Sequence, residues 1–232
     1  MNHKENPIII CDNISKIYGT GASAVHALRG VSFQILPGEH VAIMGRSGSG
    51  KSTLLNILGC LDMATSGTYT FLGTNVAKLT DDELSQMRGK EIGFIFQAFH
   101  LLPHLTILEN TALPLFYQGV PKNIRLEEAR KSLELVGMSH RATHFPNEIS
   151  GGEKQRAAIA RAMVHKPKVL FADEPTGNLD SSLKNEILDH LCNLNKNFNI
   201  TLIVITHDDD TAARAKRTLI FSDGKIIKEN IV

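Results

Sequence analysis

The hydrophobic and polar positions predict a chain built around buried parallel strands. Two unbroken apolar runs, 169–172 and 202–205, have the length and composition of strands that are covered on both faces. A third apolar run, 40–44, breaks into glycines and resumes as a helical pattern over 52–58. A strand, a glycine-rich loop and a helix in that order open a βαβ unit, so the pattern predicts an α/β fold.

The remaining segments differ in character. Residues 8–36 predict short antiparallel strands, and residues 218–227 predict a C-terminal hairpin. Residues 105–147 carry little strand signal and predict a mostly helical insertion. Apolar positions at helical spacing predict two more helices, over 151–165 and 183–194. We expect an α/β core with a mixed sheet, an N-terminal antiparallel β part and a helical insert.

No linker or repeat divides the chain, so residues 1–232 are predicted to form one domain with a helical subdomain at about 98–165. Hydrophobic residues are 42% and charged residues 21%, which excludes a disordered or collagen-like chain. The formal net charge is +1, so there is no overall charge signal for nucleic acid or anionic lipid.

Cysteine usage and hydropathy limit the class further. Cys11, Cys60 and Cys192 show no CxxC spacing, which argues against a disulfide framework or a zinc site and favours a reducing compartment. No apolar run approaches the roughly 18 residues that span a bilayer, and the start of the chain lacks the apolar core of a secretion signal. We expect a cytoplasmic protein that does not cross a membrane by itself.

The glycine loop carries the first chemical motif. Residues 45–52 match GxxxxGK[ST], in which backbone N–H groups and a helix N-terminus surround phosphate oxygens. Lys51 is expected to reach the β- and γ-phosphates and Ser52 to bind Mg²⁺. The alternative is a glycine turn with an exposed lysine. The nucleotide-binding residues predicted here are Gly45, Ser47, Gly48, Ser49, Gly50, Lys51, Ser52 and Thr53.

Two carboxylates, Asp173 and Glu174, end the apolar run that begins at Val169. An aspartate that leaves a buried strand beside a phosphate loop is suited to hold Mg²⁺. A glutamate one residue further is suited to polarise an attacking water molecule. Neighbouring carboxylates are also common at strand ends, so the pair alone is a weak signal. The phosphate loop upstream is what favours a catalytic role for it.

A second anion site is predicted at Ser150-Gly151-Gly152, where a serine and two glycines open a helix. One chain has no evident need for two phosphate sites about a hundred residues apart. The arrangement is explained if two copies pair head to tail, so that Ser150 of one copy closes over the γ-phosphate held by the other.

With these motifs in this order, the chain resembles the ATP-binding-cassette (ABC) family of transport ATPases along almost its whole length. The resemblance implies that Tyr18 stacks on adenine, that Gln97 contacts Mg²⁺ and water and senses a membrane subunit, and that His207 reaches the γ-phosphate. Asp180, in Gly-Asn-Leu-Asp, matches a further nucleotide-site position. The implied catalytic residues are Glu174, His207, Lys51 and Gln97, and the implied metal ligands are Ser52, Gln97 and Asp173.

Four segments narrow the resemblance to the subfamily of macrolide-export and lipoprotein-release ATPases. They are 56–62, 100–106, 109–110 and 173–180. The sequence also departs from the wider family pattern. Its signature reads Ile-Ser-Gly-Gly-Glu instead of Leu-Ser-Gly-Gly-Gln, and Gly177-Asn178 replaces the more usual Ser-Ala, as is typical of this subfamily.

The resemblance implies an ATPase that uses ATP and Mg²⁺, pairs with a second copy of itself and drives integral membrane subunits in export or extraction of a substrate. It implies a peripheral location at the cytoplasmic face of the inner or plasma membrane and no nucleic-acid partner. The main alternative is a regulatory ABC ATPase of the cell-division type that moves no solute. A phosphate-loop kinase does not explain Ser150, and DNA-repair or translation ABC proteins carry long inserts or two cassettes. The transported substrate is not encoded in this chain.

Several residues keep a second interpretation. Tyr18 is alternatively an edge-strand aromatic, Gln97 a surface polar residue, and Asp180 a helix N-cap. The leucines near Gln97 are either local core or the lining of a groove for a helix of the membrane partner; they are Leu101, Leu102, Leu105 and Leu108. The nine histidines other than His207 have no motif context.

Overall fold

The computed structural model describes residues 6–231, so residues 1–5 and Val232 of the predicted domain lie outside the described residues. The chain divides into two compact units. We call residues 6–85 with 195–231 the terminal unit and residues 86–194 the central unit. Two helices run across the division, α2 (Asp81–Glu91) and α6 (Ser181–Phe198).

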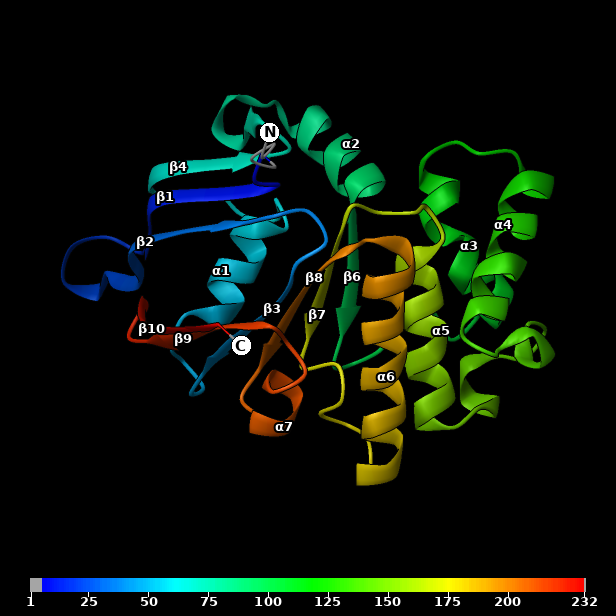
Figure 1. The fold of residues 1–232 in the computed structure, drawn as a ribbon. Helices are drawn as coiled ribbons and strands as arrows, with labels where there is room; N and C mark the ends of the chain where they lie inside the picture. Colours follow the sequence, from blue (N-terminus) through cyan, green and yellow to red (C-terminus); the bar gives the residue numbers. More distant parts are fainter. Residues whose placement is uncertain (1–5, 232) are drawn as a thin grey trace, which may run out of the picture. The chain divides into compact units, whose positions relative to one another are not determined.

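The terminal unit contains an antiparallel sheet with the strand order β2-β1-β4-β5. Three of these strands lie side by side in Figure 1. Antiparallel strands were expected over 8–36, but β1 and β2 are ten and eleven residues long instead of short, and register shifts interrupt their pairing. The strands are β1 (Ile9–Tyr18), β2 (Val25–Ile35), β4 (Ser66–Phe71) and β5 (Thr74–Asn75).

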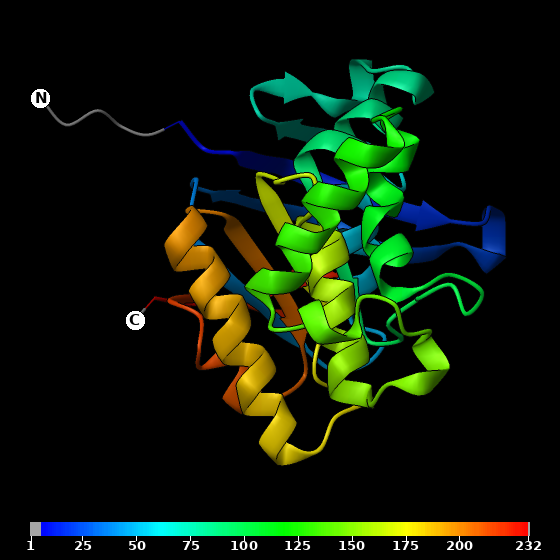
Figure 2. The same cartoon turned by 90° about the vertical axis from the view of Figure 1, so that its right-hand side faces the viewer.

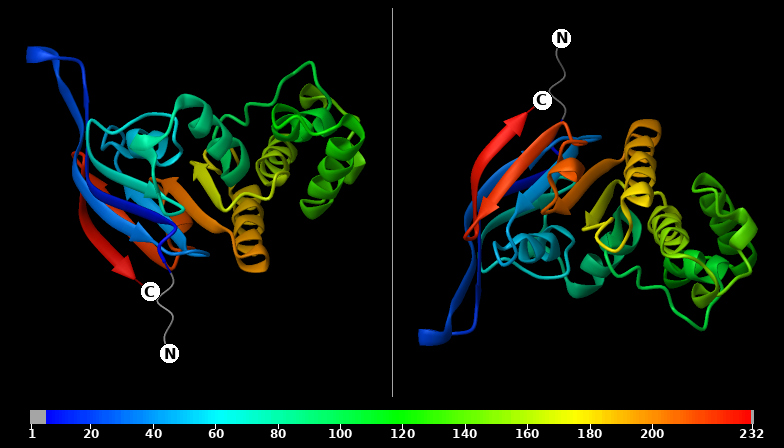
Figure 3. Two further views of the ribbon diagram at one scale, coloured as in Figure 1. Left: turned by 90° about the horizontal axis from the view of Figure 1, so that it is seen from above. Right: turned by 90° about the horizontal axis from the view of Figure 1, so that it is seen from below.

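The terminal unit also contributes four strands to a mixed sheet. β3 (His40–Gly45) pairs in parallel with β8 (Thr201–Thr206) and with β9 (Arg217–Ser222). β9 pairs antiparallel with β10 (Lys225–Ile231), and both are visible in orange and red in Figure 3. All residues of β8 are buried, as predicted for a strand covered on both faces.

Helix α1 (Lys51–Leu58) follows β3 after the glycine loop, which confirms the predicted strand–loop–helix order. Leu54 and Leu58 are fully buried at helical spacing, and this fixes the face of α1 that packs inward. The short helix α7 (Asp209–Ala212) was not predicted. Single 3₁₀ turns occupy Gly21–Ser23, Val76–Lys78, Ser139–Arg141 and Pro146–Glu148.

In the central unit, β6 (Ile92–Phe96) pairs in parallel with β7 (Val169–Asp173). The predicted helical character of the middle of the chain is confirmed by three helices, α3 (Ile107–Tyr117), α4 (Lys122–Leu135) and α5 (Gly151–Met163). These helices lie together, in green to yellow-green, in Figure 2. Their shared core contains Ala112, Leu115, Ala129 and Val164.

Candidate functional site

The phosphate loop lies between β3 and α1 in the terminal unit. Gly50 precedes α1 with φ +104°, and a Cβ atom there would lie 2.5 Å from the Ala27 carbonyl oxygen, so no other residue fits. Lys51 is 8% exposed, and its Nζ donates to the carbonyl oxygens of Gly45 (2.6 Å) and Arg46 (2.9 Å). The ammonium group therefore points back across the start of the loop, where a phosphate group would find a positive charge.

The other predicted residues of this loop differ in exposure. Ser49 is buried, and its hydroxyl has no hydrogen-bond partner among the described residues. Ser47, Gly48 and Ser52 are exposed residues. Thr53 is half-buried. The exposed face of the loop is thus polar.

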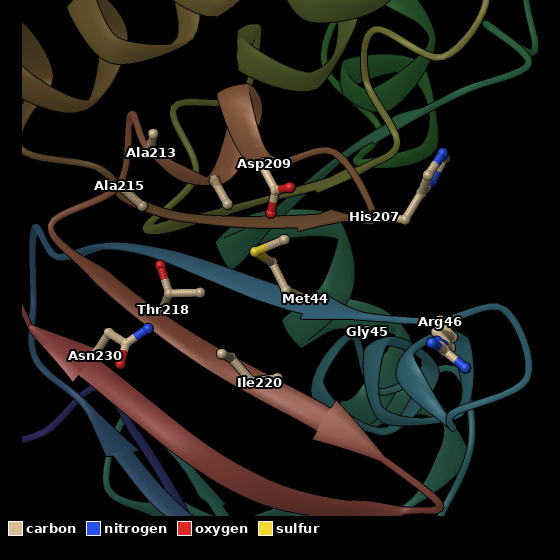
Figure 4. Close-up of a pocket in the computed structure, with 11 residues that line it drawn as sticks. Met44, Gly45, Arg46, His207, Asp209, Ala213, Ala215, Thr218, Ile220 and Asn230 are labelled. Atoms are coloured by element: carbon tan, nitrogen blue, oxygen red, sulfur yellow. The ribbon is translucent and has the colours of Figure 1, made fainter.

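His207 follows β8 and lies at the same sheet edge as the loop. Met44 pairs with Thr206 in the parallel ladder, so Gly45, the last residue of β3, and His207, the first residue after β8, lie at the carboxyl ends of neighbouring strands. These residues border a pocket of about 450 Å³ in the terminal unit (Figure 4). Asp208 then begins α7 by accepting a hydrogen bond from the Thr211 N–H at 2.7 Å, which holds the backbone directly after His207.

Tyr18 ends β1, and other side chains hold its ring in place. Its hydroxyl donates to Asp62 Oδ2 at 2.8 Å, and Lys16 Nζ donates to Asp62 Oδ1 at 2.6 Å. Lys16 Nζ also lies 4.9 Å from the centre of the Tyr18 ring. Burial and then the hydrogen bond to Asp62 raise the pKa of the Tyr18 hydroxyl. The ring remains partly exposed, as a stacking surface requires.

Sequence reasoning did not find Lys16 and Asp62 as supports for this ring. The available signal was the strand period, because residues 16 and 18 of a strand point to the same face. Asp62 comes from the loop after α1 and reaches β1 only in the folded chain.

In the central unit, Gln97, Asp173 and Glu174 gather at the carboxyl ends of two parallel strands. Phe96 pairs with Asp173, so Gln97 and Glu174 leave the sheet next to each other. Glu174 has φ +45°, which is costly for a residue other than glycine and typical of functional positions. The Gly177 N–H donates to the Glu174 carbonyl oxygen at 3.0 Å and closes the turn behind it.

Ser150 begins α5 with a complete capping box. Its Oγ accepts from the Glu153 N–H, and Glu153 Oε2 accepts from the Ser150 N–H at 2.8 Å. Glu153 Oε1 accepts from Arg141 Nε at 2.8 Å. The glutamate that departs from the family pattern therefore has a structural partner at each oxygen.

Helix α5 is also tied to neighbouring segments of the central unit. Buried Gln155 donates from Nε2 to the Pro175 carbonyl oxygen at 2.6 Å, next to Glu174. A Cβ atom on Gly152 would lie 3.1 Å from Leu183 of α6, so glycine allows the two helices to approach. The Ser150 end of α5 and the turn after β7 are thus parts of one packed structure.

We expect the charge of Glu153 to stabilise the protein in a defined pH range. The Ser150 backbone N–H and then the Arg141 side chain lower the pKa of Glu153 from 4.5 to about 2, against the opposing effect of burial. A lowered pKa in the folded state stabilises it above pH 4.5, and this stabilisation disappears as the pH falls towards 2.

Glu153→Gln should therefore lower the midpoint of thermal unfolding at pH 7, with a difference from the parent that shrinks between pH 4.5 and 2. Thermal scans across this range measure it. Glu134→Gln, at an exposed position of α4, is the control. A difference that is constant with pH would show that Glu153 acts through packing and not through its charge.

Asp180 forms the hydrogen bonds of a helix cap. Its Oδ1 accepts from the N–H groups of Ser182 (3.1 Å) and Leu183 (3.0 Å) at the start of α6. The Leu183 hydrogen bond is the main reason that the pKa of Asp180 is lowered. The capping interpretation of Asp180 thus has direct geometric support, and its role toward a nucleotide stays a prediction.

The predicted metal ligands offer the atoms that Mg²⁺ prefers. Ser52 belongs to the terminal unit, and Gln97 and Asp173 belong to the central unit. Each carries a side-chain oxygen, in hydroxyl, amide and carboxylate groups, and hard cations such as Mg²⁺ select oxygen ligands. Within residues 6–231, no group of three or more His, Cys, Asp or Glu side chains forms another candidate metal site.

A phosphate loop between β3 and α1, with two carboxylates at the end of β7, defines a P-loop nucleotide hydrolase. A family model described as ABC transporter matches residues 28–177. The chain belongs to the ABC transporter family, and it is an ATP-binding subunit with ATPase activity.

Relatives and solved structures agree with this assignment. YvrO of Bacillus subtilis, described as an uncharacterized ABC transporter ATP-binding protein, is 46% identical over 95% of this chain and 96% of its own length. The macrolide export ATP-binding/permease protein MacB of Shigella flexneri is 45% identical over 96% of this chain, which spans 34% of MacB. The expected resemblance to the macrolide-export subfamily is confirmed.

Among solved structures, the dimeric bacterial ABC transporter cassette MJ0796 matches with a TM-score of 0.88 and 41% identity. The match covers 96% of this chain and 98% of that one. A dimeric post-hydrolysis state of MJ0796 with ADP and Pi matches with the same TM-score and 40% identity. The predicted fold class is therefore confirmed. No helix within residues 6–231 is both long and apolar enough to cross a bilayer.

Proposed function

We propose that two copies of this chain bind two MgATP molecules, each between the phosphate loop of one copy and the Ser150 turn of the other. The supporting observation is the cap of α5. The Ser150 hydroxyl oxygen accepts from the Glu153 N–H, which leaves its own proton to donate to a γ-phosphate oxygen. Dimeric MJ0796 structures, one with ADP and Pi, support pairing of this kind.

The proposed roles follow the chemistry of each side chain. Tyr18 stacks on the adenine, Lys51 neutralises phosphate charge, and Glu174 orients the attacking water. His207 stabilises charge that develops on the γ-phosphate. Ser52, Gln97 and Asp173 hold Mg²⁺, which neutralises charge on the phosphate oxygens. Remaining nucleotide contacts are proposed for the loop backbone, the Ser150 turn and Asp180.

ATP favours the paired state because its γ-phosphate contacts both surfaces at once. A ligand shifts an equilibrium only by its differential affinity for the two states, and this contact supplies the difference. Hydrolysis removes the shared contact and lets the copies separate. We propose that residues 1–232 act in this cycle as a single ATP-binding domain with a helical subdomain at about 98–165.

We propose that the cycle powers integral membrane subunits in export or extraction of a substrate, with this chain at the cytoplasmic face of the membrane. Relatives that carry an export name support this direction. The central unit has a pocket of about 370 Å³. Its lining includes Phe99, His100 and Leu101, which follow Gln97 closely in the sequence, together with Lys154 of α5. We propose that a helix of the membrane partner docks there. Co-purification of that partner would separate a transporter from a regulatory ABC ATPase.

Ser150→Arg tests the pairing. A long charged side chain at the proposed interface should abolish ATP-dependent dimerisation and reduce hydrolysis, because the γ-phosphate loses its second surface. Size-exclusion chromatography with and without ATP measures this. Ser150→Thr, which retains a capping hydroxyl, is the matched control and should still dimerise. An unchanged dimer of Ser150→Arg in ATP would refute the proposed pairing.

A further inference from the structure

Gln97 and Asn178 are joined by two hydrogen bonds within the central unit. Asn178 Nδ2 donates to the Gln97 backbone carbonyl oxygen at 2.8 Å. Gln97 Nε2 donates to Asn178 Oδ1 at 3.3 Å. The pair links the segment after β6 to the segment after β7, which also carries Glu174.

These bonds decide which end of the Gln97 amide is used. A backbone carbonyl only accepts, so Asn178 must present its NH₂ group to it. Asn178 Oδ1 is then the atom that faces the Gln97 side chain. Because this oxygen only accepts hydrogen bonds, Gln97 must donate to it from its own NH₂ group. The carbonyl oxygen Oε1 of Gln97 is left for other partners, and it is the only side-chain atom of glutamine that binds a hard cation.

Gly177 makes room for this arrangement. A Cβ atom at position 177 would lie 2.7 Å from Gln97 Nε2, closer than such contacts normally are. The backbone of Gly177 lies outside the left-handed region, so an alanine there would not strain its own backbone and would instead displace the Gln97 side chain. Gly177 and Asn178 thus form a matched pair, at the two positions where the sequence replaces the more usual Ser-Ala.

We propose that Asn178 is a positioning residue that holds the Gln97 amide so that Oε1 is the atom offered to Mg²⁺. The proposal rests on the metal-binding role of Gln97 proposed above. It assigns a purpose to Gly177-Asn178: the glycine leaves space for the glutamine amide, and the asparagine sets its orientation.

The first experiment uses the nucleotide-free protein and no turnover. Amide hydrogen exchange is followed by mass spectrometry in the parent, Asn178→Ala and Asn123→Ala. Asn123 is an exposed residue of α4 and serves as the control. Asn178→Ala should increase exchange in residues 96–101 by about threefold to tenfold, as expected for a lost hydrogen-bonded contact. Unchanged exchange in this segment would overturn the proposal.

The second experiment measures the Mg²⁺ concentration for half-maximal ATP hydrolysis. Asn178→Ala should raise it by about threefold or more, from the same loss of a positioned contact. Gly177→Ala keeps Asn178 but displaces Gln97, and it should raise the value in the same direction. In a Gln97→Ala background, Asn178→Ala should add nothing, because the residue it positions is absent.

Failure of the positioning role of Asn178 can be distinguished from failure of the proposed function. Independent, additive effects of Asn178→Ala and Gln97→Ala, or an effect on the maximal rate with no change in Mg²⁺ dependence, would refute the positioning role. If the parent chain hydrolyses no ATP, the proposed function fails, while the exchange experiment still reports on the Gln97–Asn178 contact by itself.

Discussion

Glu174→Gln should reduce the rate of ATP hydrolysis by about 10²-fold or more while ATP still binds. Loss of a positioned general base typically costs 10² to 10⁴ in rate. Glutamine has the shape of glutamate but no carboxylate, and it keeps the same cost of φ +45° at this position, so the substitution isolates the proton-accepting group. Steady-state phosphate release measures turnover, and a separate titration measures ATP binding.

The same variant should accumulate as an ATP-bound dimer, because the shared γ-phosphate is no longer removed. Size-exclusion chromatography with ATP should show this dimer, whereas the parent returns to monomer as ATP is consumed. The control Glu134→Gln removes a carboxylate from α4 and should behave as the parent. Parent-like hydrolysis by Glu174→Gln would assign the water-orienting role to another residue.

Lys51→Ala should weaken nucleotide binding by about tenfold or more, because charge-assisted hydrogen bonds to phosphate are among the stronger polar contacts. The Lys51 ammonium already lies at the start of the loop, bound to two carbonyl oxygens there. Removing it deletes the positive charge and also the bonds that close the loop. Equilibrium titration with an ATP analogue measures binding.

Two controls separate these effects. Lys51→Met keeps the apolar stem in its buried position without the charge, so equal losses in Lys51→Met and Lys51→Ala identify the charge as the cause. Lys228→Ala removes an exposed lysine of β10 and should leave binding unchanged. If Lys51→Met binds nucleotide as the parent does, Lys51 supports the loop structure and not the phosphates.

Local sequence predicted the parts of the fold that carry a strong periodic signal. The buried strand β8 was predicted because its central residues 202–205 are all apolar, and helix α5 was predicted because apolar residues repeat along one of its faces. Strand β4 was missed because its short, mostly polar sequence buries only Tyr69 and Phe71. Strand β6 was missed because its sequence is only five residues long, is interrupted by Gly93 and has no alternation of apolar and polar residues.

Features of the candidate site were likewise predictable from sequence only where neighbouring residues form them. The phosphate loop could be identified from sequence because a continuous stretch of backbone makes it, so spacing alone is informative. The cap at Ser150 is similarly local, since Glu153 lies three residues away. The contacts of Tyr18 with Asp62 and of Gln97 with Asn178 join residues 44 and 81 positions apart, and no local spacing predicts them.

The sequence by itself determined the family and the ATP-hydrolysing chemistry, and it predicted the residues proposed to carry that chemistry, because backbone loops and helix starts are encoded by neighbouring residues. Tertiary structure alone decided how those side chains are held. Lys16 and Asp62 fix the Tyr18 ring, Arg141 completes the partners of Glu153, and Asn178 orients Gln97. The physical reason is that hydrogen bonds require atoms about 3 Å apart, and folding brings distant parts of a chain that close.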